Sequence, residues 1–100
     1  MKVYQYRVAN IATASGTTSQ QSLNVIGGLC RQVYIIANTA TTIFKVNVQD
    51  ESNLKIMDYP SHTGILNDIG MAIPMAGKYT INITNASQDD IFNILIAVEE

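Results

Sequence analysis

The sequence predicts an all-β fold, a small antiparallel β-sandwich of the jelly-roll or Greek-key type with about seven or eight strands. Three observations predict it. Val, Ile and Thr make up 30 of the 100 residues, and these side chains suit a pleated sheet. Apolar and polar residues alternate along several short segments, and Gly, Pro, Asn and Asp separate those segments. One hundred residues are the size of one domain, so we interpret residues 1–100 as a single β-sandwich domain.

The N-terminal part combines two short strands with a polar loop. Tyr4, Tyr6 and Val8 alternate with polar residues, which predicts one strand, and a second is predicted just before Gly27 and Gly28. Residues 12–21 (ATASGTTSQQ) are small and polar. We interpret residues 1–21 as a partly extended N-terminal arm that stays mobile until it is bound.

The middle of the chain predicts a hairpin followed by an irregular stretch. Residues 29–37 are apolar on both faces, and residues 42–50 (TIFKVNVQD) alternate after a turn-prone NTATT. A polar turn and a short strand at residues 54–57 come next. In residues 61–76, Gly and Pro recur too often for a long element, so at most two short strands are expected there.

The C-terminal part gives the clearest strand patterns. Residues 78–86 (KYTINITNA) place Tyr79, Ile81 and Ile83 on one face and polar residues on the other, which predicts a half-buried strand. Residues 91–98 carry apolar side chains on both faces. We therefore expect the last strand to be covered on both sides.

Charge and composition exclude several partners. Only 14% of residues are charged, against about 25% in a typical soluble domain. The net charge is −2 and the basic residues are scattered, so we expect no nucleic-acid partner. No apolar run approaches the length that spans a bilayer, so we expect no membrane partner either. Low charge is instead typical of surfaces that neighbouring subunits cover.

Catalytic and metal-binding signatures are missing. The single histidine, His62, follows Asp58 and precedes Asp68, and we interpret it as a solvated loop residue. Residues 50–53 and 89–90 contain carboxylates that could supply calcium ligands, but hairpin turns explain them better. One cysteine permits no intrachain disulfide and no zinc cluster. We expect neither an enzyme nor a cofactor.

The predicted function therefore depends on surfaces. The candidate interface combines residues of the two strands that are apolar on both faces with two tyrosines that share one face of the first strand: Tyr34, Ile36, Ile91 and Leu95, and Tyr4 and Tyr6. Five tyrosines could instead line a sugar-binding platform, although Trp, the usual leading residue of such platforms, is absent. A carbohydrate- or receptor-binding module thus remains an alternative.

From Gly28 onward the sequence resembles the small jelly-roll proteins that decorate the heads of tailed bacteriophages. Two segments carry the likeness: LCRQVYIIANTATTIFKVNVQDESNLKI, and IPMAGKYTINITNASQDDIFNILIAVEE with its I-P-x-x-G-x-Y motif. The resemblance implies a capsid decoration or cement protein, made in the host cytoplasm and located in the virion. It further implies an oligomer, a trimer by preference, that bridges major capsid protein subunits. A head-tail or tail component of the virion is the alternative within this class.

Overall fold

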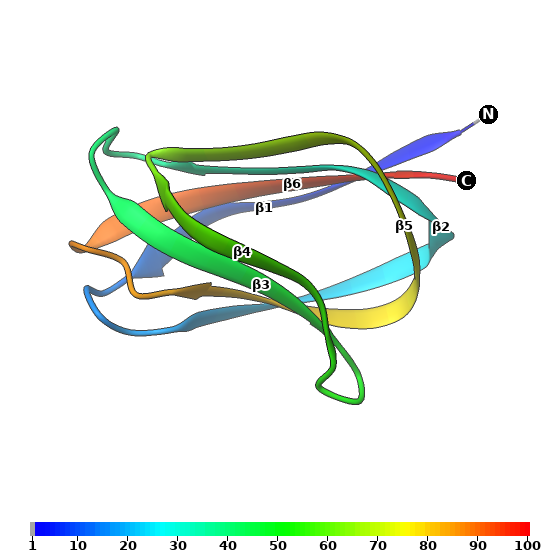
Figure 1. Ribbon diagram of the computed structural model, residues 1–100, viewed down its shortest axis with the longest axis horizontal. Helices are drawn as coiled ribbons and strands as arrows, with labels where there is room; N and C mark the ends of the chain where they lie inside the picture. Colours follow the sequence, from blue (N-terminus) through cyan, green and yellow to red (C-terminus); the bar gives the residue numbers. More distant parts are fainter. Residues whose placement is uncertain (1) are drawn as a thin grey trace.

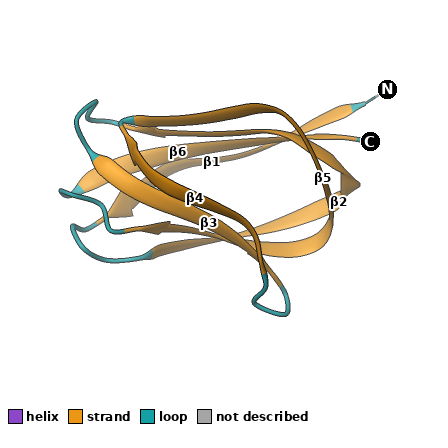
Figure 2. Cartoon of the chain, in the orientation of Figure 1, coloured by secondary structure: helices purple, strands orange, loops and turns teal. Residues whose placement is uncertain are grey.

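The computed structural model describes residues 2–100, which form six β-strands and no helix (Figures 1 and 2). The strands, in chain order, are β1 (Val3–Thr13), β2 (Ser19–Ala37), β3 (Ile43–Asp50), β4 (Lys55–Thr63), β5 (Ile65–Thr84) and β6 (Asp90–Glu99). They form one antiparallel sheet in the order β1-β6-β2-β5-β3-β4. Every neighbouring pair in this sheet is antiparallel, so the all-β antiparallel prediction is confirmed.

The two longest strands, β2 and β5, each take part in two sets of pairings. Residues 28–36 of β2 pair with residues 65–75 of β5 and also with β6, which in turn pairs with β1. Residues 19–25 of β2 pair with residues 77–83 of β5, whose other side pairs with β3 and then β4. We call β1, β6, residues 28–36 of β2 and residues 65–75 of β5 the first strand group. The second strand group consists of β3, β4, residues 19–25 of β2 and residues 77–83 of β5.

Glycines mark the place where β2 and β5 pass from one group to the other. Gly28 has φ of 155° and Gly77 has φ of 95°, a region that side chains with a Cβ rarely adopt. A Cβ on Gly28 would lie 2.3 Å from the carbonyl oxygen of Glu99, so this position accepts glycine alone. The register shifts between Val25 and Gly28, as expected of a β-bulge that bends a strand.

One hydrophobic core lies between the two groups. Phe44 of β3 and Phe92 of β6 are fully buried, and their rings meet edge to face with centroids 5.0 Å apart. Because β2 and β5 separate β3 from β6 in the sheet, this contact requires the sheet to curl until its two groups face each other. In Figure 1, β3 and β4 cross in front of β6 and β1, in keeping with that contact.

A buried polar cluster joins the two groups at one end of the molecule. The Thr42 hydroxyl, just before β3, donates to the carboxylate of Asp90 at the start of β6. The backbone N–H groups of Thr39 and Ile91 donate to the same carboxylate at 3.1 and 2.7 Å. Both Thr42 and Asp90 are buried, and these bonds compensate the cost of burying a charge.

The structure corrects the predicted number of strands: residues 2–100 form six and not seven or eight. The expected break at Gly27 and Gly28 is a bulge within β2, and the region predicted to be irregular belongs to β4 and β5. Glycines with positive φ, such as Gly70, bend β5 without ending it. Within the expected arm, β1 pairs with β6 and residues 14–18 form the connection to β2, while Met1 lies outside the described residues.

Candidate interaction surface

The outward side of the first strand group gathers apolar side chains from three strands. Leu95 of β6 lies directly opposite Tyr34 of β2, and Ile36 of β2 lies opposite Ile65 of β5. Directly opposed residues in an antiparallel pair project to the same side of a sheet, and every second residue along a strand does too. The larger apolar residues on this side, which we call the apolar face, are Tyr34, Ile36, Ile65, Ile69, Ile91 and Leu95; the polar residues Gln32, Asn67 and Asn93 lie among them.

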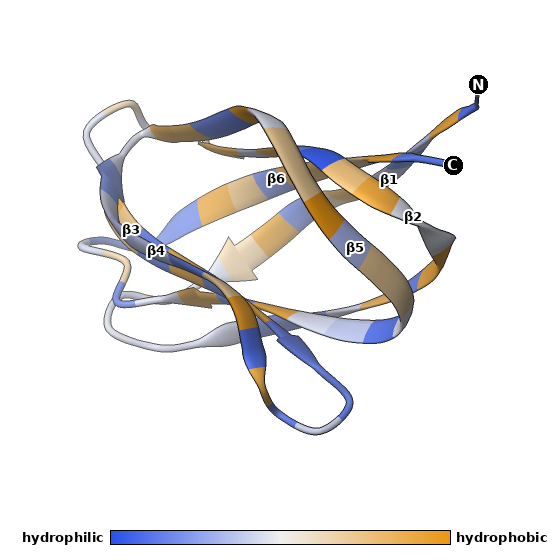
Figure 3. Ribbon diagram, turned by 45° about the vertical axis from the view of Figure 1, so that its right-hand side comes forward, coloured by the Kyte–Doolittle hydropathy of each residue, from blue (hydrophilic) through white to orange (hydrophobic). Residues whose placement is uncertain are grey.

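Three isoleucines leave much of the apolar face accessible to solvent. Ile69 is 66% exposed, Ile65 is 45% exposed and Ile91 is 42% exposed, while the other three members are half-buried. In Figure 3, hydrophilic bands interrupt the hydrophobic colour along β1, whereas β6 carries a continuous apolar stretch in its second half. Contiguous apolar patches on a soluble domain often mark sites of interaction.

The six candidate interface residues do not all lie on this face. Tyr4 and Tyr6 are opposite Val98 and Ile96, whose side chains are buried in the core, so both tyrosines project to the inner side at the sheet edge. The Tyr6 hydroxyl accepts a 3.0 Å hydrogen bond from the N–H of Ile26, and the Tyr4 hydroxyl donates to Glu100 at 3.0 Å. The structure thus brings together Tyr34, Ile36, Ile91 and Leu95.

Sequence reasoning missed Ile65 and Ile69. Their segment was expected to be irregular because of its glycines, so no face was assigned to it. A signal was present in the alternation of the segment. Ile65 and Ile69 fall on one side of the strand, and Leu66, which is 1% exposed, falls on the other. The period-2 pattern continues up to the bulge at Gly70.

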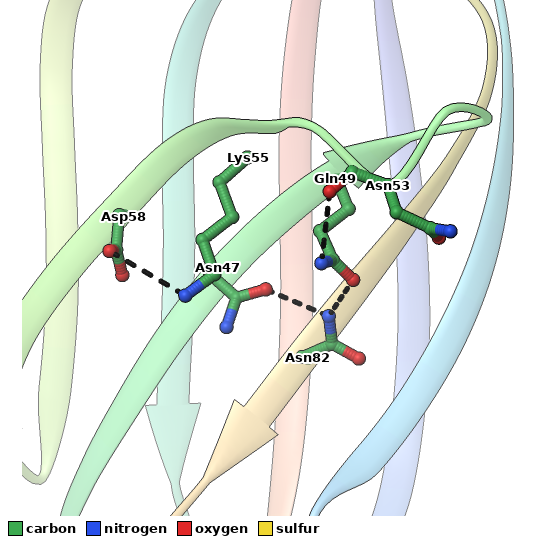
Figure 4. A network of polar contacts seen from close by, with 6 residues as sticks. All are labelled: Asn47, Gln49, Asn53, Lys55, Asp58 and Asn82. Carbon is green, nitrogen blue, oxygen red and sulfur yellow. Dashed lines mark hydrogen bonds and ion pairs between the residues drawn. The ribbon is translucent and has the colours of Figure 1, made fainter.

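The outward side of the second strand group is polar. The Asn82 side-chain amide of β5 donates to the side-chain oxygens of Asn47 at 2.8 Å and Gln49 at 2.9 Å, both on β3 (Figure 4). Beside this network, the Lys55 ammonium lies 3.9 Å from the Asp58 carboxylate on β4 (Figure 4). We call Asn47, Gln49, Asn82, Lys55 and Asp58 the amide face.

Asn82 is the most deeply placed member of the amide face. It is 5% exposed, and its Oδ1 atom is buried without a hydrogen-bond partner in the structure. Two donated bonds thus satisfy the nitrogen and leave the oxygen unsatisfied, which costs part of their gain. The pattern of KYTINITNA had placed Asn82 on the polar side of the strand, and the structure confirms that side.

The residues considered for catalysis do not assemble into a site. His62 lies at the end of β4, not in a loop, and its Nδ1 is 2.7 Å from the carbonyl oxygen of Pro60. Asp68 accepts a 2.8 Å hydrogen bond from the Tyr59 hydroxyl instead of facing His62. Burial raises the pKa of Tyr59 well above its ordinary value, and the bond to Asp68 adds to this. Burial also raises the pKa of Cys30, which favours the unreactive thiol.

The residues considered for calcium belong to turns. Asp50 accepts hydrogen bonds from the hydroxyl and N–H of Ser52 and from the N–H of Leu54, and these bonds lower its pKa. Asp89 accepts from the N–H of Ser15 at 2.8 Å. Within residues 2–100, no three His, Cys, Asp or Glu side chains lie close enough to hold a metal ion.

A hollow of about 570 Å³ opens at the end of the molecule where β1 and β6 meet the loops. Its lining includes Thr13, Asn38, Asp89 and Asp90. Burial alone would raise the pKa of Asp90, but its hydrogen bonds outweigh burial and hold that pKa below the ordinary value. The carboxylate of Asp90 is thus engaged by the fold itself.

Comparisons with known proteins assign no family to the chain. No family model matches it, and no curated protein matches it. Among solved structures, it is similar to a chain from the "Structure of infectious bursal disease virus Gx strain", with 6% identity and a TM-score of 0.40. The match covers 98% of this chain but only 32% of the viral chain. In addition, residues 2–100 contain no helix long and apolar enough to cross a membrane.

Proposed function

We propose that this chain is a non-enzymatic structural protein of a virus particle that binds a neighbouring protein subunit through the apolar face. The observation that carries the proposal is the exposure of Ile65, Ile69 and Ile91 together on one outward sheet face. These side chains face away from the core, so they contribute little to the fold of the monomer. Covering them with another subunit removes apolar area from water and favours association.

The proposed fold behind this function is a jelly roll. A jelly roll has eight strands in two facing sheets, and it recurs in viral capsid domains, lectins and cupins. Dividing β2 between Val25 and Gly28 and β5 between Met75 and Gly77 gives eight segments in two groups of four, and the Phe44–Phe92 contact supports an arrangement in which the groups face each other. This geometry supports the proposal independently of the sequence resemblance to phage head proteins.

Within the virion, we favour a capsid decoration or cement protein that bridges major capsid protein subunits. A subunit that holds a shell together needs an interaction surface and no catalytic group, which fits the side chains described above. The alternative position is the head-tail junction or the tail. Copy number separates them, because a shell carries hundreds of copies whereas cyclic neck and tail rings carry about six to twelve.

The direct test uses purified particles of the virus that encodes the chain. Quantitative mass spectrometry should find the protein in hundreds of copies per particle, and its absence from particles would refute the proposal. Purified Ile69→Asp protein should then fail to rebind particles stripped of the native protein. Leu54→Asp is the matched control, because Leu54 is similarly exposed at 63% but lies next to β4, away from the apolar face.

A carbohydrate-binding module is the second candidate, and the amide face is the observation that favours it. Asn47, Gln49 and Asn82 present amide groups, which can both donate to and accept from sugar hydroxyls. Glycan-array binding that is lost in Gln49→Ala and kept in Ile69→Asp would support this candidate. In the particle assay, binding that is lost in Ile69→Asp and kept in Gln49→Ala supports the virion proposal.

A further inference from the structure

The free edge of β1 presents backbone groups that can pair with another strand. The N–H of Glu100 donates to the carbonyl of Lys2 at 2.9 Å, so Lys2 and Glu100 form a hydrogen-bonded pair. Such pairs alternate along an antiparallel ladder, which makes Tyr4 and Tyr6 the next residues bonded to β6. The backbone groups of Val3, Gln5 and Arg7 therefore point away from the sheet.

The other sheet edges are less suited to pairing. Pro60 lies within β4, and both Pro74 and the bulge at Gly70 interrupt the first part of β5. Proline lacks the N–H that a ladder needs, and natural proteins use it with bulges to block edge pairing. The free part of β2, residues 19–25, is short and ends at the bulge between Val25 and Gly28. Residues 3–8 of β1 contain no proline or glycine, and the β1 bulge begins after Val8.

We propose that two copies of this chain pair antiparallel through β1, about a two-fold axis at Gln5. Gln5 then faces the partner's Gln5, and Val3 faces the partner's Arg7. This register joins three outward-facing residue pairs and gives about six backbone hydrogen bonds. A shift of two residues in one direction places Val3 opposite Ala9, which lies in the bulge between Val8 and Ile11, and in the other direction it loses the Arg7 pairing.

The side chains of β1 complement one another in this register. Arg7 faces an apolar residue and not the partner's Arg7, so no like charges are directly opposed. On the inner side, Tyr4 faces the partner's Tyr6, and the two-fold axis creates this aromatic pair twice. Cross-strand aromatic pairs stabilise antiparallel ladders. The pairing would cover two tyrosines that are only half-buried in the single chain.

This dimer rests on the proposed function and sharpens it by naming a partner, a second copy of the chain. Because β1 belongs to the first strand group, pairing at its edge aligns two first groups side by side. Their apolar faces then lie on the same side of a continuous sheet. A two-fold pair also differs from the trimer that the phage resemblance implies, so the oligomeric state decides between them.

Single-cysteine variants test the register. Residues in a hydrogen-bonded antiparallel pair have Cα atoms about 5.5 Å apart, within the range that a disulfide spans. Under mild oxidation, Gln5→Cys should form a covalent dimer, whereas Val3→Cys should not, because its equivalent lies about 13 Å away along the strand. The double variant Val3→Cys with Arg7→Cys should cross-link. Cross-linking of Val3→Cys alone, or of none of these variants, would overturn the proposed register.

A proline variant tests the backbone pairing. Gln5→Pro removes an N–H that points away from β6 and should weaken the dimer about 30-fold, while Gln5→Ala keeps the N–H and should dimerise normally. Sedimentation equilibrium gives both dissociation constants, and circular dichroism confirms that each variant is folded. A native protein that stays monomeric at millimolar concentration overturns the dimer. The virion proposal fails separately, by absence of the protein from particles, so the two failures are distinguishable.

Discussion

The apolar face and the amide face occupy the outer sides of the same curled sheet, yet they differ in whether their side chains find partners within the chain. On the amide face, Asn82 bonds to Asn47 and Gln49, so the polar groups find partners within the chain. On the apolar face, Ile65 and Ile69 gain nothing comparable, because their exposed surface stays in contact with water. Most of the amide groups on one face are thus bonded within the single chain, whereas the proposed partner would cover the exposed apolar side chains of the other.

The size of the apolar face limits what it can do alone. Full burial of an isoleucine contributes about 1.5–3 kcal/mol, so covering what remains exposed of three of them contributes about 3 kcal/mol. Association costs about 4–15 kcal/mol in lost translational and rotational freedom. The face therefore needs additional contacts, and either the β1 edge or the many copies in a shell can supply them.

The largest expected effect comes from the contact that holds the two faces back to back. Phe92→Ala should lower the free energy of unfolding by about 4 kcal/mol, because it removes a fully buried ring that packs on Phe44 across the core. Urea denaturation followed by circular dichroism measures the loss. The neighbouring Ile91→Ala, on the exposed side of the same strand, is the control and should cost less than about 1 kcal/mol. Equal losses would contradict the assignment of inner and outer sides.

The next largest effect on the free energy of unfolding is expected at Asp90, because its buried cluster joins the first strand group to the second at one end of the molecule. Asp90→Ala should cost about 2 kcal/mol through its lost charge-assisted hydrogen bonds. The pKa of Asp90 is lower in the folded chain, so its stabilisation is complete above the unfolded pKa of about 3.9 and is lost as the pH falls through the folded value. Denaturation curves from pH 7 to pH 2 should therefore converge for wild type and variant. Asp89→Ala is the exposed control.

A smaller effect is expected on the amide face. Asn82→Ala removes both amide hydrogen bonds and should destabilise the fold by about 1 kcal/mol, since its unpartnered Oδ1 already offsets part of their gain. Asn47→Ala removes one of the two bonds and should cost less. Thermal unfolding of both variants gives the comparison. A larger loss for Asn47 than for Asn82 would mean that the network is not centred on Asn82.

Alternation alone predicted the strands whose two faces differ. In β5, Tyr79, Ile81 and Ile83 are buried as predicted, because no bulge separates them. In β6, Phe92, Ile94, Ile96 and Val98 are buried on one side, but Ile91 on the other side is 42% exposed, so the predicted covering of both sides is wrong for the single chain. Period-2 patterning fails where a bulge inserts an extra residue and exchanges the two faces.

That failure explains the errors around residues 25–37. Strict alternation along residues 29–37 would place Leu29 on the same face as Val33, yet Cys30 is the fully buried residue there, because the register shifts between Cys30 and Gln32. The same effect hid Ile69, which is followed by the bulge at Gly70. The position of a bulge depends on pairing between distant strands, so local sequence does not reveal it.

The smallest expected effect on stability is also the sharpest test of the comparison. Ile65→Thr and Ile69→Thr should each change the free energy of unfolding by less than about 0.5 kcal/mol, because their side chains are largely exposed. Each should nevertheless shorten retention of the folded protein on a hydrophobic column, because exposed apolar area is lost from the apolar face. Leu54→Thr removes a similarly exposed but separate side chain, so its retention should change less. If Leu54→Thr changed the retention as much as Ile69→Thr, the six residues would not act as one face. The apolar face would then not define an interaction site.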